Sequence, residues 1–119
     1  MSLATETPAI PPVSVLGDHE RELAEGVYDF AVESIAPQSA RMDRDNVMDP
    51  DLIRKFFDLD LMGIEIPEEF GGSGYGFVEL GIVLEEMGRA LLCAPFFSTA
   101  VLAANTLLQS GDEAAKAKY

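Results

Sequence analysis

Apolar residues recur at helical spacing along most of this chain, beginning near Asp18. Asp18 can cap a helix start, and the apolar positions of the segment that follows fall on one face: Leu23, Val27, Phe30, Ala31 and Ile35. Pro37 cannot donate a backbone hydrogen bond and disfavours helical geometry at the residue before it. The pattern predicts a first helix that kinks or restarts at Pro37, before the charged stretch 41–45.

A second helix is predicted at Asp49-Pro50-Asp51, because Asp can cap free amides and Pro at the first helical position loses no bond. Its apolar residues form one broad side, and Gly63 is expected to end it in the left-handed conformation. A short extended link follows, and then a tight loop rich in glycine: Gly71, Gly72, Gly74 and Gly76.

Two more helices are predicted, at about 77–89 and at about 95–108. The first is amphipathic, with Glu85, Glu86 and Arg89 facing water. The second is apolar around nearly its whole circumference, which predicts burial on several sides. Gly111 should end it, and Asp112 should cap a final helical run that stops at the last residue. Short connections, no strand pair and no internal repeat together predict an all-α fold, a helical bundle.

Length and composition narrow the class of protein. A chain of 119 residues with 48% hydrophobic content can build one domain, expected over residues 18–119 after a flexible leader at 1–17. The formal net charge of -13 disfavours nucleic acid and anionic membranes as partners, and no apolar run reaches the roughly 20 residues of a membrane span. One cysteine, Cys93, and one histidine, His19, allow neither an internal disulfide nor a zinc cluster. A soluble, cytoplasmic protein is expected.

Residues that could carry chemistry of their own are scarce. The pair Glu85-Glu86 lacks the helical His partner of a di-iron site, because position 89 is Arg, and is interpreted as a solvated face. Glu65, Glu68 and Glu69 are assigned no role, and Cys93 has no His or Lys neighbour that would activate it. No strand precedes the glycines and no Lys follows them, so they do not form a phosphate loop. No catalytic residue and no metal site are expected.

The segment 63–74, GIEIPEEFGGSG, resembles the "G-I-x-x-P-E-x-x-G-G-x-G" link of the acyl-CoA dehydrogenase family. The segment 29–46, DFAVESIAPQSARMDRDN, is similar to the family's first helix with its "I-A-P" break. LEEMGR at 84–89 resembles the family's "L-E-E-x-[SG]-R" helix end, and the closing segment 110–119 resembles "x-G-[ST]-x-x-Q-K-x-x-[YW]". The resemblance covers roughly residues 18–119 in matching order and spacing.

The resemblance implies the N-terminal helical domain of an enzyme that also has a middle β domain and a C-terminal helical bundle, with FAD and the acyl chain between them. In that family a carboxylate on the C-terminal part removes the α-proton and the β-hydrogen leaves as hydride to the flavin. No residue here matches that base, and FAD would be bound mainly by domains not present in this chain. The implied partners are an acyl-CoA or acyl-carrier thioester and an electron-transfer flavoprotein, in a homo- or hetero-oligomer. The chain is therefore expected to be truncated before the middle β domain, and to be inactive alone.

The family resemblance also suggests where an acyl chain would lie. The helix matching 96–108 forms part of the family's acyl pocket, and a nearly all-apolar helix suits a desolvated cavity. The substrate-binding candidates are Phe96, Phe97, Thr99, Ala100 and Ala103. The alternative is that these side chains only fill the core. The bulk of Phe96 and Phe97 favours a short or branched acyl group, whereas Gly76 departs from the polar residue with which the family usually starts the preceding helix.

Other functions stay open at this point. The chain could be one half of a split or heteromeric flavoenzyme, or a non-catalytic helical interaction module. The sequence segments in this chain do not distinguish a dehydrogenase from the oxidases and flavin monooxygenases of the same family.

Overall fold

A long composite helix opens the fold. The computed structural model describes residues 15–119, so most of the predicted leader, residues 1–14, lies outside the described residues. Helix α1 (Asp18–Phe30) continues through the π-helical segment η1 (Ala31–Ile35) into α2 (Ala36–Asp45). The N-cap is Gly17, so the prediction that Asp18 caps this helix is wrong. Asp18 is instead the first helical residue. Its carboxylate interacts favourably with the positive end of the helix dipole and forms an ion pair with Arg21 at 2.9 Å.

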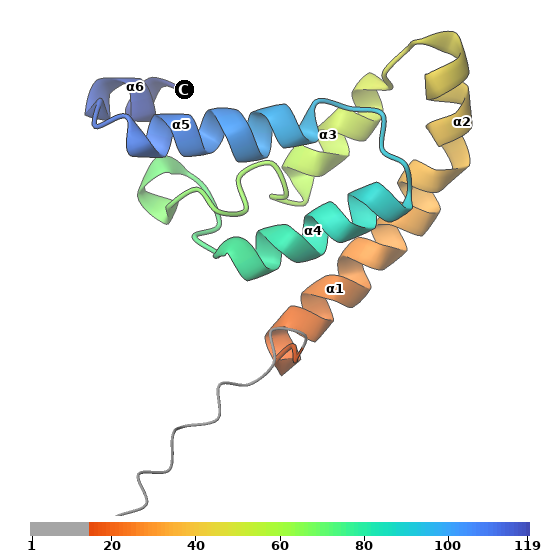
Figure 1. Ribbon diagram of the computed structural model, residues 1–119, viewed down its shortest axis with the longest axis horizontal. Coiled ribbons are helices and arrows are strands. Elements are labelled where there is room, and N and C mark those ends of the chain that lie inside the picture. Colours follow the sequence, from red (N-terminus) through yellow and green to blue (C-terminus); the bar gives the residue numbers. More distant parts are fainter. Residues whose placement is uncertain (1–14) are drawn as a thin grey trace, which may run out of the picture.

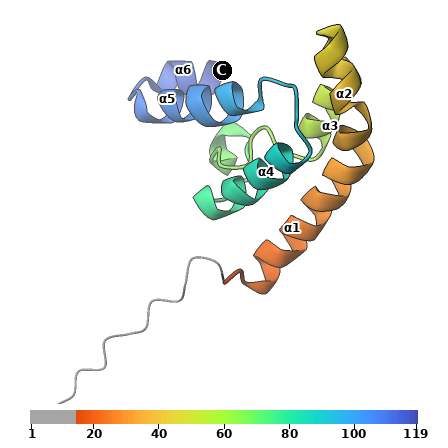
Figure 2. The ribbon, with the colours of Figure 1, turned by 45° about the vertical axis from the view of Figure 1, so that its right-hand side comes forward.

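The helix is not interrupted at Pro37. A proline inside a helix removes one N–H donor, and its ring presses on the carbonyl four residues earlier. The wider π-helical turn η1 ends at Ile35, two residues before Pro37, and spans the carbonyls on which the ring would press, so the helix bends and continues to Asp45. Figures 1 and 2 show the three segments as one bent rod. It ends at Asn46, which takes the left-handed conformation with φ of 52°.

Helix α3 (Pro50–Asp58) starts as predicted. The Asp49 carboxylate accepts a hydrogen bond of 2.9 Å from the backbone N–H of Asp51, and Pro50 occupies the first helical position. The helix ends earlier than expected, however. Asp60, with φ of 56°, makes the left-handed turn, whereas Gly63 is not among the residues with positive φ. The prediction that Gly63 ends this helix is therefore wrong.

The link between α3 and the next helix folds back on itself. It contains the short 3₁₀ helix η2 (Glu68–Phe70), and two glycines that follow have positive φ, Gly71 at 85° and Gly74 at 67°. The backbone N–H of Ser73 donates to the carbonyl of Gly63 at 3.0 Å, and that of Tyr75 donates to Ile64 at 2.9 Å. The predicted tight loop is confirmed, and these cross-links make it a stiff unit.

Helix α4 (Phe77–Arg89) has the predicted bounds. Its N-cap, Gly76, has no side chain to accept the first amides, but its own N–H donates to the Glu79 carboxylate at 3.0 Å. The next helix begins with the π-helical segment η3 (Phe97–Ala103) and continues as α5 (Ala104–Gln109). Asp112 caps α6 (Glu113–Lys118) as predicted, by accepting from the backbone N–H of Ala115 at 2.9 Å.

The helices cross obliquely and do not form a parallel bundle. Helix α4 packs along α1, and η3–α5 runs back above it, with α3 and the link between (Figures 1 and 2). Every element in residues 15–119 is helical, which confirms the all-α class. No helix among these residues has the length and apolar character needed to cross a bilayer.

Phe56 lies at the centre of the core. It is fully buried, meets Phe30 edge-to-face at 5.3 Å between ring centroids, and lies 5.4 Å from Phe96. One buried hydrogen bond ties distant parts of the chain together, from the Ser39 hydroxyl to the carbonyl of Ala90 at 2.6 Å. The core therefore gathers side chains from all parts of the domain: Val27, Ala31, Ile35, Met42, Leu52, Phe56, Leu61, Ile64, Leu80, Val83, Met87, Ala90, Phe96 and Ala100.

The helix η3–α5 is buried along one side within this chain. Phe96, just before it, and Ala100 and Ala104 are buried, whereas Phe97 and Leu102 are each 54% exposed. The prediction that this helix is covered on several sides is wrong for the residues described. Its apolar character leaves hydrophobic surface exposed instead.

Candidate functional site

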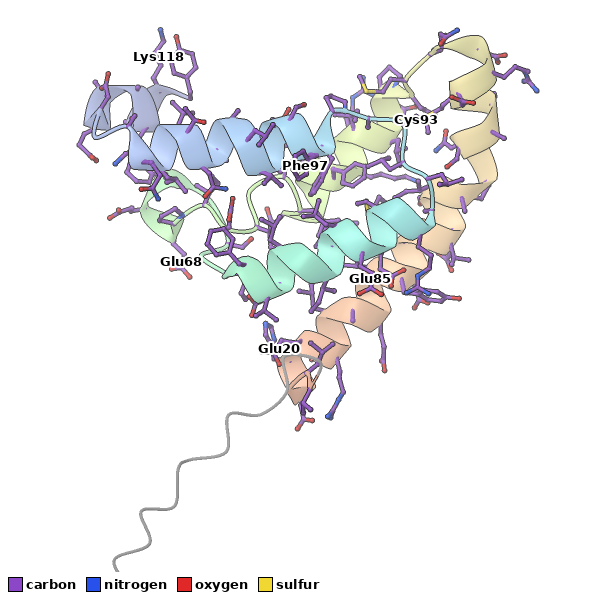
Figure 3. The ribbon with its side chains drawn as sticks, viewed as in Figure 1. Glu20, Glu68, Glu85, Cys93, Phe97 and Lys118 are labelled. Atoms are coloured by element: carbon purple, nitrogen blue, oxygen red, sulfur yellow. The ribbon has the colours of Figure 1, made fainter. Side chains whose placement is uncertain are left out.

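A groove of about 600 Å³ lies between the link and the helix η3–α5. One wall is the stretch from Met62 to Ser73 and the other is η3–α5, with Lys116 of α6 and Tyr119 also in the lining. Its apolar lining residues come from both walls and from Phe57 at the end of α3; those of the walls are Met62, Ile66, Phe70, Ala103, Ala104, Leu107 and Leu108. In Figure 3 the link, with Glu68 labelled, lies below η3–α5, and Lys118 points outward from α6.

The polar groups of the groove are few. Asp60, Ser73, Thr99, Lys116 and Tyr119 line it beside the apolar majority. Lys116 is the basic member of this set, and its ammonium already pairs with the Glu113 carboxylate at 2.7 Å. A groove of this kind removes hydrocarbon from water, which contributes about 0.8 kcal/mol per buried methylene, and offers little to an anion.

The structure divides the predicted substrate-binding residues into three environments. Thr99 and Ala103 line the groove. Phe96 and Ala100 are buried in the core, at 3% and 2% exposure. Phe97 is largely exposed and does not belong to the groove lining. Neither phenylalanine lines the groove, so their bulk does not limit its size here.

The sequence analysis missed the wall made by the link. Ile66 and Phe70 supply its apolar side chains, and Gly71 and Gly72 leave its backbone bare. Gly72 lies so close to Ile66 that an added Cβ would be 2.1 Å from the Ile66 carbonyl oxygen. The density of glycines was a usable signal, because glycine recurs where one stretch of backbone approaches another.

Glu65 and Asn105 join the two walls. The Asn105 side-chain amide donates to the Glu65 carboxylate on the link, and to the carbonyl of Val101 in its own helix at 2.8 Å. Partial burial raises the pKa of the Glu65 carboxyl above its ordinary value, and the hydrogen bond from Asn105 opposes part of this rise. Glu65, to which no role was assigned from the sequence, is thus a structural part of the site.

Glu86 also differs from its predicted environment. It is 8% exposed, so the interpretation of Glu85-Glu86 as a solvated face is wrong for this residue. It faces a shallow recess beside α1, formed with Tyr28 and Asp29 among others. Its Oε2 lies 3.1 Å from Arg89 Nε, within ion-pair distance but without hydrogen-bond alignment. Glu85 stays exposed, as predicted, and pairs with Arg89 at 3.0 Å.

Comparison with known proteins places the chain in a family. Residues 17–119 match the family model described as "Acyl-CoA dehydrogenase, N-terminal domain". The chain belongs to the acyl-CoA dehydrogenase family. It is 35% identical to the short/branched chain specific acyl-CoA dehydrogenase of Bos taurus over 72% of the chain, and 32% identical to the isovaleryl-CoA dehydrogenase of Pongo abelii over 94%. It is also 32% identical to the 2-methylacyl-CoA dehydrogenase of Solanum tuberosum over 99% of the chain.

The chain spans less than a third of the length of these relatives. The matched share is 21% of the Bos taurus protein, 27% of the Pongo abelii protein and 30% of the Solanum tuberosum protein. What is matched is the N-terminal helical domain. The family resemblance inferred from the segment 63–74 and its flanking motifs is therefore confirmed.

Acyl-CoA dehydrogenases use FAD, and the groove does not fit that group. A dinucleotide pyrophosphate needs positive charge or a row of free backbone N–H donors. The groove offers Lys116, which is already paired with Glu113, in a chain of net charge -13. Its apolar lining suits a hydrocarbon chain better than a flavin nucleotide.

Proposed function

We propose that this domain forms one side of the acyl-binding pocket of an FAD-dependent acyl-CoA dehydrogenase, which introduces an α,β double bond into an acyl thioester. The observation that carries the proposal is the apolar groove between the link and η3–α5, lined by Thr99 and Ala103. The family membership supplies the reaction class. A non-catalytic interaction module does not account for the groove's apolar lining as directly, whereas one half of a split enzyme would have the same groove.

The domain's contribution is binding and the exclusion of water. Its residues surround the hydrocarbon part of the substrate, so the reacting carbons are held in a dry environment while other parts of the enzyme act on them. The base that removes the α-proton and the flavin contacts are assigned to residues outside this chain. In this proposal the chain alone is inactive.

The proposed substrate is a short or branched acyl group carried on CoA. The support comes from the relatives, whose names specify short/branched chain, isovaleryl and 2-methylacyl substrates. Transfer of electrons to an electron-transfer flavoprotein, assembly into an oligomer and a cytoplasmic location stay predictions from the sequence.

The test is to narrow the groove in an enzyme that contains all its domains. Ala103→Phe places a ring in the groove, whereas Ala40→Phe places the same ring on the exposed face of α2, away from it. Anaerobic bleaching of the flavin absorbance by acyl-CoA thioesters of increasing length reports both the cofactor and the reaction. We expect Ala103→Phe to reduce the bleaching rate for longer or branched acyl groups by about tenfold or more relative to the shortest, since each excluded methylene costs about fourfold.

The control should keep the wild-type length profile. Equal loss of rate at every length in Ala103→Phe would contradict the proposal, and so would an enzyme whose flavin is not bleached by any acyl-CoA.

A further inference from the structure

Among the described residues, the side-chain contact between Glu65 and Asn105 is the hydrogen bond that directly joins the two walls of the groove. Glu65 belongs to the link and Asn105 to α5. The backbone hydrogen bonds donated by residues 62–75 all end on other residues of the link, so none of them reaches η3–α5. Both walls also contribute buried apolar residues to one core, Ile64 from the link and Ala100 from η3. Packing of this kind does not specify a distance as sharply as a hydrogen bond does.

The orientation of Asn105 follows from its two neighbours. The Val101 carbonyl and the Glu65 carboxylate are both acceptors, so the amide nitrogen must face them and can give one hydrogen to each. The bond of 2.8 Å to Val101 ties the side chain to its own helix, at the π-helical segment that carries Thr99 and Ala103. Asn105 is therefore held in place before it meets the link.

The backbone on either side of Glu65 is held by the link. The backbone N–H of Ile66, the next residue, donates to Gly63 at 3.1 Å, and that of Tyr75 donates to Ile64 at 2.9 Å. Because these bonds make the link stiff, a displacement of Glu65 displaces the wall that includes Ile66 and Gly72. The contact thus couples two stiff units at one point.

We propose that Glu65 and Asn105 are positioning residues, whose hydrogen bond sets the width of the groove and so the size of acyl group that it accepts. This inference rests on the proposed function, because it needs an acyl chain in the groove. Neither residue belongs to the groove lining, so their effect on selectivity acts through the walls.

The test compares single and double replacements in the enzyme with all its domains. Glu65→Ala and Asn105→Ala each remove the contact, whereas Glu65→Gln keeps an acceptor oxygen for Asn105. We expect each alanine variant to raise kcat/KM for longer acyl groups relative to the shortest, by about fourfold for each methylene that the wider groove admits. The double variant should show no more than the single ones, as for one shared interaction, and Glu65→Gln should keep the wild-type ratio.

The outcomes separate this inference from the proposed function. An unchanged length ratio in the alanine variants, with Ala103→Phe still shifting it, overturns the positioning role and leaves the groove assignment intact. If Ala103→Phe also has no effect on the ratio, the proposed function fails and this inference fails with it. Equal loss at all lengths together with a lower melting temperature in Glu65→Gln as well as in the alanine variants assigns the pair a purely structural role, which also overturns the inference.

Discussion

Phe96 and Phe97 are neighbours in the sequence with opposite environments. Phe96 is 3% exposed and packs on Phe56, whereas Phe97 is 54% exposed at the start of η3. The helical turn places adjacent residues about 100° apart, so one ring reaches the core and the other does not. For aromatic residues of equal size, the difference in burial decides their contribution to stability.

This contrast gives a prediction that needs no ligand. We expect Phe96→Ala to lower the free energy of unfolding by about 3 to 5 kcal/mol, through lost burial and the cavity beside Phe56. Phe97→Ala should lower it by less than about 1 kcal/mol, because its ring is already largely in water. Chemical denaturation at low protein concentration measures both. Similar losses in the two variants would show that Phe97 is buried in this domain.

The link illustrates how glycines act at the level of an element. Gly72 has no room for a side chain, because a Cβ there would meet the backbone of Ile66 at 2.1 Å. Gly81 lies in the middle of α4 on its exposed side, where a Cβ would have no neighbouring atom within 4 Å. The first glycine is required by packing, and the second only weakens a helix.

The two glycines should respond in opposite directions to the same replacement. Gly72→Ala is expected to lower the melting temperature by several degrees, since the link must open to admit the methyl group. Gly81→Ala should raise stability by about 0.5 to 1 kcal/mol, through better helix propensity. Thermal unfolding followed by circular dichroism compares them directly. A stability gain in Gly72→Ala would mean that the close approach to Ile66 is absent.

The elements that could be predicted are those whose signals are local. Asp49 and Asp112 bond amides two and three residues ahead, and the apolar period of α4 needs nothing beyond its own turn. The misplaced features depend on distant partners or on a competing turn. Glu86 is buried because α1 packs over it, and Gly63 does not turn the chain because Asp60 has already done so.

The difference between local signals and distant partners also explains which residues of the candidate site could be predicted from the sequence. Of the residues selected by resemblance to a family helix, Thr99 and Ala103 line the groove, whereas Phe96 and Ala100 face the core. Helical position alone does not say which neighbour a face meets. The opposite wall, with Ile66 and Phe70, becomes visible only once the link folds back against η3–α5.

At the scale of the whole molecule, apolar surface and charge oppose each other. Large hydrophobic side chains are exposed on several elements: Phe57, Phe77, Leu91, Phe97, Leu102 and Tyr119. Surfaces of this kind favour association, because burying them removes apolar area from water. The net charge of -13 acts in the other direction, by repulsion between like-charged copies.

Ionic strength should therefore determine whether the isolated 119-residue chain self-associates. Salt at about 0.1 M and above shortens the range of charge repulsion to about 10 Å or less, while leaving the hydrophobic term in place. We expect the chain to be largely monomeric in low salt and to self-associate as salt is added, with increasing binding of a dye for apolar surface. Sedimentation velocity across a salt series measures this.

The double variant Phe97→Ser with Leu102→Ser removes two exposed apolar side chains from η3 without touching the core. It should associate less at every salt concentration, because both side chains are 54% exposed. A chain that stays monomeric at high salt without binding dye would show that these exposed side chains do not form an associating surface.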